Sequence, residues 1–144
     1  MSNSSTICVD ANIIIRLTLK LDDEVIRQLW ASWMSQEVRL VAPTLLFYEV
    51  ANGLYRQEKR EQLSSAFIRY ALDFALNLPV QLVGDATLHQ RAHALAAQYN
   101  LPATYDAHYL ALAERLNIDL WTSDAKLFNT VRSAGVEWVK LVEK

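Results

Sequence analysis

The chain has 144 residues, 52% of them hydrophobic, and only three glycines and three prolines, which excludes a disordered or collagen-like chain and suits one domain, residues 1–144, with a sizeable core. The formal net charge of −2 gives no general basic field for binding nucleic acid, although a local basic patch is compatible with it. The single cysteine excludes a disulfide framework, and the lack of a signal-peptide core or a membrane-length apolar run predicts a cytoplasmic protein without a membrane partner.

The pattern of apolar residues and chain breakers predicts strands that alternate with helices. In chain order the elements are expected at residues 7–9 (strand), 11–19 (helix), from 22 or 23 (helix), 40–42 (strand), from 43 (helix), from 64 or 65 to 78 (helix), 80–83 (strand), from 85 (helix), 105–116 (helix), 119–122 (strand), 123–135 (helix) and 137–142 (strand). Pro43 is expected in the first turn of its helix, where its missing N–H costs nothing, and the polar residues 57–62 are expected to end that helix. Thr104 is expected to cap the helix after it, and Gly135 to form a left-handed C-cap.

This alternation predicts the fold class. Strands that alternate with helices form a parallel sheet with helices on both faces, so we expect a single-domain α/β fold with five strands. In such a sheet the strand order reverses at one point, and ligands bind there, outside the carboxyl ends of the strands. The residues that follow the predicted strands are therefore the first candidates for a functional site.

Two acids stand in that place. Asp10 follows the strand at 7–9 directly, and Asp124 follows the strand at 119–122 with only Ser123 between them. Thr122 and Ser123 add hydroxyl groups beside Asp124. The structural alternative for Asp10 is that it merely caps the next helix, as aspartate often does.

Two further acids lie on predicted helices. Asp106 is in the first turn of its helix, where the alternative is a favourable interaction with the helix dipole. Glu49 lies on the apolar stripe of its helix, where a bare charge would be costly to bury, so it needs a partner. Asn52, three residues on, shares that face and could orient Glu49. A metal ion would be a better partner.

The four acids together predict an all-oxygen cluster formed by Asp10, Glu49, Asp106 and Asp124. Hard cations such as Mg²⁺ or Mn²⁺ prefer such ligands. Asp10 and Asp124 are expected to be the most direct ligands, while Glu49 and Asp106 bind a second metal or hold its waters. The chemistry that this set suggests is phosphodiester hydrolysis with metal-activated water.

The same residues carry a resemblance to a known family. The segments Cys8–Asn12, Tyr48–Asn52, Tyr105–Ala113 and Thr122–Asp124 resemble PIN-domain ribonucleases, and most closely the VapC toxins of toxin–antitoxin pairs. They occur in the family's order and span nearly the whole chain. The resemblance implies a metal-dependent endoribonuclease acting on RNA, a homodimer, and a cognate antitoxin that inhibits it. It also implies that the four acids form the active site, with Asn12 and Thr122 as supporting polar residues.

Three other groups of residues have open interpretations. One basic concentration is either a solvated helix end or a contact for the RNA backbone: Arg56, Lys59, Arg60 and Arg69. One apolar group is either core or a partner-binding surface: Trp30, Trp33 and Met34. His89 and His93 have metal-ligand spacing on one helix, but no third ligand is evident, so we expect ordinary histidines.

Two alternative functions remain open at this point. A PIN-like domain could bind RNA or protein without cutting it, although the presence of all four acids argues against an inactive site. A metal-dependent phosphatase acting on small phosphoesters would use the same ligands. Cleavage of RNA with and without a chelator distinguishes these possibilities from an endoribonuclease.

Overall fold

The computed structural model describes residues 5–61 and 63–143 and contains a five-stranded parallel sheet, which confirms the predicted α/β architecture. The strands lie in the order β3-β2-β1-β4-β5. Their bounds are β1 Thr6–Val9, β2 Arg39–Pro43, β3 Val80–Val83, β4 Asp119–Thr122 and β5 Val139–Leu141. Residues 1–4, where no signal-peptide core is expected, lie outside this description, as do residues 62 and 144.

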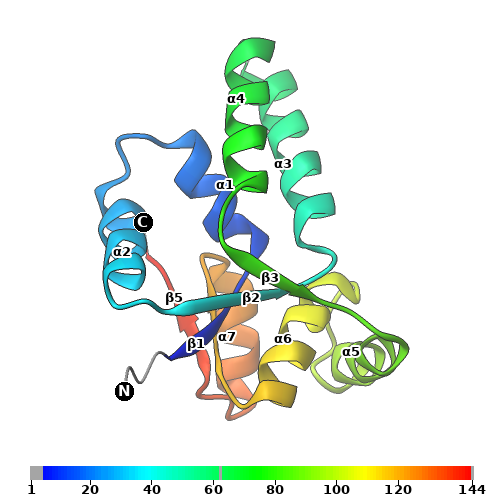
Figure 1. Ribbon diagram of the computed structural model, residues 1–144. Coiled ribbons are helices and arrows are strands. Elements are labelled where there is room, and N and C mark those ends of the chain that lie inside the picture. The colour runs from blue at the N-terminus through cyan, green and yellow to red at the C-terminus, as the bar shows by residue number, and fades with distance from the viewer. Residues whose placement is uncertain (1–4, 62, 144) are drawn as a thin grey trace.

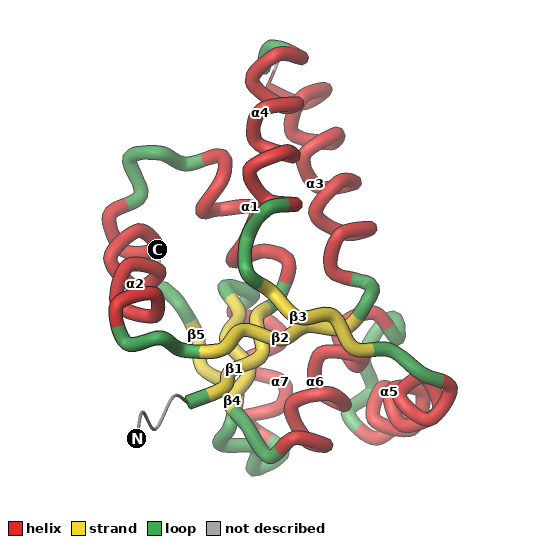
Figure 2. The backbone as a smooth tube through the Cα atoms, viewed as in Figure 1, coloured by secondary structure: helices red, strands yellow, loops and turns green. Residues whose placement is uncertain are grey.

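Helices cover both sides of the sheet (Figures 1 and 2). In Figure 1, α1, α3 and α4 lie on one side, and α5, α6 and α7 lie on the other. The helices in the described part of the chain are α1 Ala11–Leu19, α2 Glu24–Ser35, α3 Leu46–Glu61, α4 Ser65–Leu76, α5 Ala86–Gln98, α6 Tyr105–Leu116 and α7 Ala125–Ser133. None of these helices is long and apolar enough to cross a membrane.

The core lies on both faces of the central strands and includes most of α6. Cys8 and Val9 of β1 are completely buried, as expected for a parallel strand that is covered on both faces. Helix α6 packs against β1, β2 and β4 and buries Tyr109, Leu110 and Leu112. Because α6 is buried on most of its surface, its first turn is held firmly beside the ends of these strands.

The strand order places the candidate site. From the central strand β1 the chain proceeds outward through β2 to β3, and it then returns to the other side of β1 to form β4 and β5. The reversal lies between β1 and β4, where Cys8 is in register with Leu120 and Val9 with Trp121. Asp10 and Thr122 therefore emerge side by side at the carboxyl ends of these two strands, where open α/β sheets bind ligands.

Most of the predicted helix ends are confirmed by capping contacts. Helix α1 has the expected bounds. Asp23, Ser64 and Asp85 each accept a hydrogen bond from the backbone N–H three residues on, which satisfies a donor that the helix leaves unpaired. Gly135 follows α7 with a φ of 90°, a conformation that glycine adopts without strain.

The polar stretch 57–62 contains the end of α3, at Glu61, as predicted; residue 62 lies outside the description. Three details of the prediction are wrong. Pro43 ends β2 in register with Val83, and α3 begins only at Leu46. Thr104 occupies the N-cap position of α6, but its side chain makes no capping bond. Strand β5 is limited to Val139–Leu141, the part of the predicted segment paired with β4.

Candidate active site

Asp10 is buried at the end of the central strand. Its backbone N–H donates to the carbonyl of Trp121 at 3.0 Å, and the residue is only 4% exposed. Although Asp10 occupies the N-cap position of α1, its carboxylate makes no capping hydrogen bond to that helix. Its Oδ2 atom instead accepts hydrogen bonds from Thr122 Oγ1 at 2.8 Å and from Asn12 Nδ2 at 3.2 Å. The side chain of Asp10 therefore faces the end of β4 and does not serve as a helix cap.

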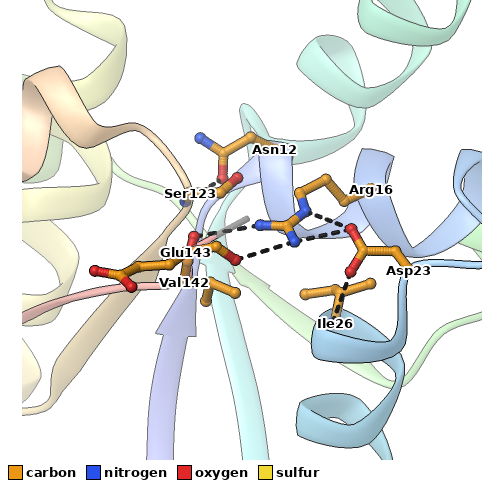
Figure 3. Close-up of polar contacts among 7 residues, drawn as sticks. All are labelled: Asn12, Arg16, Asp23, Ile26, Ser123, Val142 and Glu143. Carbon is orange, nitrogen blue, oxygen red and sulfur yellow. Dashed lines mark hydrogen bonds and ion pairs between the residues drawn. The ribbon is translucent and has the colours of Figure 1, made fainter.

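Thr122 and Asn12 join β4 to the start of α1. The Thr122 hydroxyl donates to Asp10 and accepts from Asn12 Nδ2 at 3.1 Å and from the backbone N–H of Asp124 at 3.1 Å. Asn12 Oδ1 accepts from the backbone N–H of Ser123 at 2.9 Å (Figure 3). Ser123 thus contributes its backbone to this network. These bonds fix the position of the Asp10 carboxylate. Thr122 and Asn12, which both donate to it, are themselves held by hydrogen bonds to each other and to the backbone of residues 123 and 124.

Asp124 has both a structural contact and a place at the site. Its Oδ1 accepts hydrogen bonds from the backbone N–H groups of Lys126 at 3.0 Å and Leu127 at 3.1 Å, so it caps α7. Its Oδ2 accepts no hydrogen bond from the residues that the structure describes. Asp124 also lines, with Asp106, a cavity of about 390 Å³ beside the strand ends.

Glu49 is held from the opposite helix. The buried side of α3 is formed by Leu46, Val50 and Leu54, and Glu49 lies half-buried at the edge of that stripe. The hydroxyl of Tyr109 in α6 donates to Glu49 Oε1 at 2.6 Å. This short bond supplies the partner that a carboxylate needs when it is removed from water.

Asp106 lies among the other carboxylates, in the first turn of α6, and accepts no hydrogen bond from the described residues. Burial, together with repulsion from Asp124 and Glu49, raises its pKa from 3.8 to about 6. Burial, with further repulsion from Asp106, raises the pKa of Asp10 from 3.8 to about 7, although the bond from Thr122 opposes this rise. Asp106 and Glu49 thus repel Asp10, and Asp124 and Glu49 repel Asp106, which places each of the four acids within electrostatic range of at least one other.

Glu49 and Tyr109 titrate in the same environment. Burial raises the pKa of Glu49, and the bond from the Tyr109 hydroxyl opposes that increase. Burial and the neighbouring carboxylates of Asp10 and Glu49 raise the pKa of Tyr109 far above its ordinary value, so this hydroxyl is a permanent hydrogen-bond donor.

The donor set fits a hard divalent cation in chemistry. Four carboxylates from the end of β1, α3, α6 and the start of α7 offer only oxygen ligands. A cation would relieve the repulsion that contributes to the raised pKa values of Asp10 and Asp106. No three acidic, histidine or cysteine side chains of the described residues are already grouped closely enough to hold an ion. One or two carboxylates with bound water are sufficient for Mg²⁺, which commonly keeps several waters.

Comparisons with known proteins identify the family of this chain. The PIN domain family matches residues 7–133. The chain belongs to the PIN-domain family. Ribonuclease VapC9 of Mycobacterium tuberculosis is 40% identical to it over 124 residues, which are 86% of this chain and 90% of that protein.

Solved PIN-domain structures have the same fold. A chain in a toxin–antitoxin complex from Klebsiella pneumoniae is 25% identical, with a TM-score of 0.61 over 92% of this chain and 94% of that one. The VapC20 toxin of Mycobacterium tuberculosis has a TM-score of 0.67 over 93% of this chain and 98% of its own, at 18% identity. The second likeness concerns the fold alone.

The remaining candidates lie at different places on this PIN domain. Asn52 is exposed, and the hydrogen-bond partner of Glu49 is Tyr109 instead. Trp33 is 6% exposed and packs edge-on against Trp121, so it is part of the core. Trp30 is partly buried and lines an apolar groove, whereas Met34 lines a different cavity, so these three residues do not form one surface.

The four basic candidates are all exposed on α3 and α4. Arg56 and Arg60 line a groove that includes Asn12, and Lys59 lies 5.4 Å from the centre of the Tyr55 ring. His89 contacts His108 at 2.8 Å, and His108 Nδ1 contacts the Thr104 carbonyl.

Two residues beside the candidate acids were not predicted from the sequence. Tyr109 was given no role, although its position three residues after Asp106 places it on the same face of α6 as that acid. The other is Lys126, which lines the cavity with Asp106 and Asp124. Nothing in its sequence context distinguished Lys126 from an ordinary surface lysine, because its proximity to Asp106 depends on how α6 and α7 meet in space.

Proposed function

We propose that this PIN domain is a divalent-metal-dependent endoribonuclease and the toxin of a toxin–antitoxin pair. The observation that carries the proposal is the placement of acids beside the carboxyl ends of β1 and β4: Thr122 of β4 holds the Asp10 carboxylate, and Asp106 and Asp124 line one cavity. Tyr109 of α6 holds Glu49. The relative VapC9, which is named a ribonuclease, supports the same conclusion over most of the chain. We further propose that the protein acts in the cytoplasm as a homodimer.

The side chains would divide the work as follows. Asp10, Asp124, Asp106 and Glu49 would hold Mg²⁺ or Mn²⁺, which when bound lowers the pKa of water and neutralises charge on the phosphodiester. Thr122 and Asn12 keep the Asp10 carboxylate pointed at the site, and Tyr109 does the same for Glu49. Asp124 would use its Oδ2 to hold the metal, because its Oδ1 already caps α7.

The proposed protein partner is an antitoxin that covers an apolar groove between α1, α2 and α4. The groove has a volume of about 360 Å³ and is lined chiefly by apolar side chains, among them Leu17, Trp30, Tyr70 and Phe74. Leu21, Tyr70 and Phe74 are exposed large hydrophobic residues, and such a patch on a small protein is typical of a protein interface. An arginine of the partner could pair with the acids bidentately and displace the metal.

The proposal is tested by cleavage of single-stranded RNA with Mg²⁺ or Mn²⁺, and with EDTA. We expect metal-dependent cleavage that is lost in EDTA and lost in the Asp124→Asn variant. Asp119→Asn is the matched control, because Asp119 lies at the other end of β4 and its variant should retain wild-type activity.

Each contrary result has a distinct meaning. Undiminished cleavage in EDTA would exclude the metal mechanism. Hydrolysis of a small phosphoester such as p-nitrophenyl phosphate without RNA cleavage would identify a phosphatase. Metal-independent RNA binding without any cleavage would identify a non-catalytic binding module.

A further inference from the structure

A groove leads away from the acidic site between α1 and α3, and we call it the α1–α3 groove. It has a volume of about 440 Å³. Asn12, which hydrogen-bonds to Asp10, lies at the start of α1, and Lys20 directly follows the end of that helix. The groove thus runs alongside α1 from the site to the far end of the helix. Its lining residues on α1 and α3 are mostly basic or apolar, and none of those described is acidic.

Four cations border the α1–α3 groove, and one of them is already engaged. Arg16 forms an ion pair with Asp23 at 2.8 Å and donates to the carbonyls of Val142 and Glu143 at 3.3 Å each (Figure 3). Arg16 therefore ties α1 to the start of α2 and to the end of the chain. Lys20, Arg56 and Arg60 form no ion pair with any residue that the structure describes.

The spacing of the cations suits a chain of phosphates. Arg56 and Arg60 are four residues apart on α3, so they lie about one turn, or roughly 6 Å, apart along the helix. Gly53 lies one turn before Arg56 and lets α3 approach α1 closely, because a Cβ at this position would overlap the side chain of Ile15. The close approach brings the basic residues of α3 toward Lys20 on the other wall of the groove.

We infer that the α1–α3 groove binds the phosphate backbone of a single-stranded RNA, with Lys20, Arg56 and Arg60 contacting successive phosphates on one side of the cleavage point. This inference rests on the proposed function. A polyanion fits this groove better than a protein segment does, because its unpaired charges are all positive and it starts beside the carboxylates that would receive the phosphodiester.

Of the four basic candidates, only Arg56 and Arg60 line the α1–α3 groove. Lys59 lies against the Tyr55 ring, and Arg69 is on α4; neither lines the groove. Ile15, Leu19 and Leu63 form its apolar parts, against which sugars or bases can pack. Lys59 and Arg69 are therefore natural controls, since their removal changes the net charge equally.

The test measures binding without cleavage. A fluorescein-labelled oligouridylate of about 12 nucleotides is titrated with the protein in EDTA, and anisotropy is followed between about 20 and 200 mM salt. The variants are Lys20→Gln, Arg56→Gln and Arg60→Gln, with Lys59→Gln and Arg69→Gln as controls. All five substitute exposed side chains, and unchanged melting curves will show that each variant is folded.

We expect each groove variant to bind at least about threefold more weakly at 100 mM salt, and to lower the slope of log K against log salt by about 0.7. The controls should stay within about twofold of the wild type. Equal losses of RNA affinity in the groove variants and the control variants would overturn the inference. Groove variants that lose antitoxin binding but bind RNA like the wild type would also overturn it. Because no cleavage is involved, this result is independent of the nuclease test. If the protein cleaves RNA but all five variants lose RNA affinity equally, the RNA-binding role of the α1–α3 groove is refuted while the nuclease function stands.

Discussion

Replacing Asp106 with asparagine should stabilise the metal-free protein while abolishing most of its activity. The pKa of Asp106 is raised from 3.8 to about 6, chiefly by burial and then by Asp124 and Glu49. A tenfold change in an acid constant corresponds to about 1.4 kcal/mol, so the ionised carboxylate destabilises the fold by up to about 3 kcal/mol above the folded pKa. Relaxation of the exposed part of the site reduces this, and we expect a gain of about 1–2 kcal/mol, or roughly 3–8 °C in melting temperature.

The pH dependence of this gain follows from the direction of the pKa change. Since the folded pKa is raised, the favourable contribution of the protonated acid is complete below 3.8 and is lost as the pH rises through about 6. The Asp106→Asn protein should therefore melt higher than the wild type near pH 8 in EDTA, and the difference should vanish near pH 4. Added Mg²⁺ should stabilise the wild type more than the variant, because the metal binds only the folded state.

The measurement is thermal unfolding of both proteins with EDTA and with Mg²⁺. Glu24→Gln is the matched control, because Glu24 is a first-turn acid of α2 outside the cluster. Loss of its interaction with the helix dipole should lower stability by about 0.3–1 kcal/mol. If Asp106→Asn also melts lower in EDTA near pH 8, Asp106 acts mainly on its helix dipole and the repulsion argument is refuted.

Three more predictions follow from individual contacts. Thr122→Val removes a bond that lowers the pKa of Asp10, so in the metal-free protein this pKa, followed by carboxyl NMR in EDTA, should rise above about 7. Thr18→Val, which loses only a bond to its own helix, should leave the pKa of Asp10 in place, and an unmoved pKa in Thr122→Val contradicts the argument. Tyr109→Phe removes the hydrogen bond to Glu49, so it should raise the pKa of Glu49 further and destabilise the fold by about 1 kcal/mol. The loss of stability in thermal melts should be larger near pH 8, where Glu49 is ionised, than near pH 5, and a loss that does not depend on pH would disprove this. Trp30→Ala should weaken antitoxin binding at least about tenfold in calorimetry, whereas Tyr48→Ala, an exposed residue outside the apolar groove of α1, α2 and α4, should not. If the antitoxin binds the Trp30 variant within about twofold of the wild type, that groove is not the contact.

The sequence was most informative where local patterns determine structure. The strand at β1 and the acid that follows it could be placed, because an apolar β-branched run followed by a polar residue at a helix start has few other arrangements. The caps at Asp23, Ser64 and Asp85 were predictable for the same reason, since each bond is formed within four residues.

Contacts between distant segments were harder to predict. Asn52 was expected beside Glu49. Three residues along a helix turn by about 300°, which leaves the two side chains about 60° apart, and in α3 this places Asn52 in solvent while Glu49 stays at the edge of the buried stripe. The partner of Glu49 is Tyr109, 60 residues away, and nothing local to either residue indicates the pairing. Trp33 belongs to the core because Trp121 of β4 packs against it, which again depends on the tertiary arrangement.

The ways in which the four carboxylates are held suggest how the site can accept an ion. Asp10 is fixed by Thr122 and Asn12, Glu49 by Tyr109, and one oxygen of Asp124 by the start of α7. Asp106 accepts no hydrogen bond within the described part of the chain, yet it has electrostatic contact with all of the others. Its side chain can therefore change rotamer at little cost, while any movement of the other three breaks hydrogen bonds. Closure of the site around a cation should accordingly be achieved mainly by Asp106, against a frame that the buried α6 and the parallel strands keep in place.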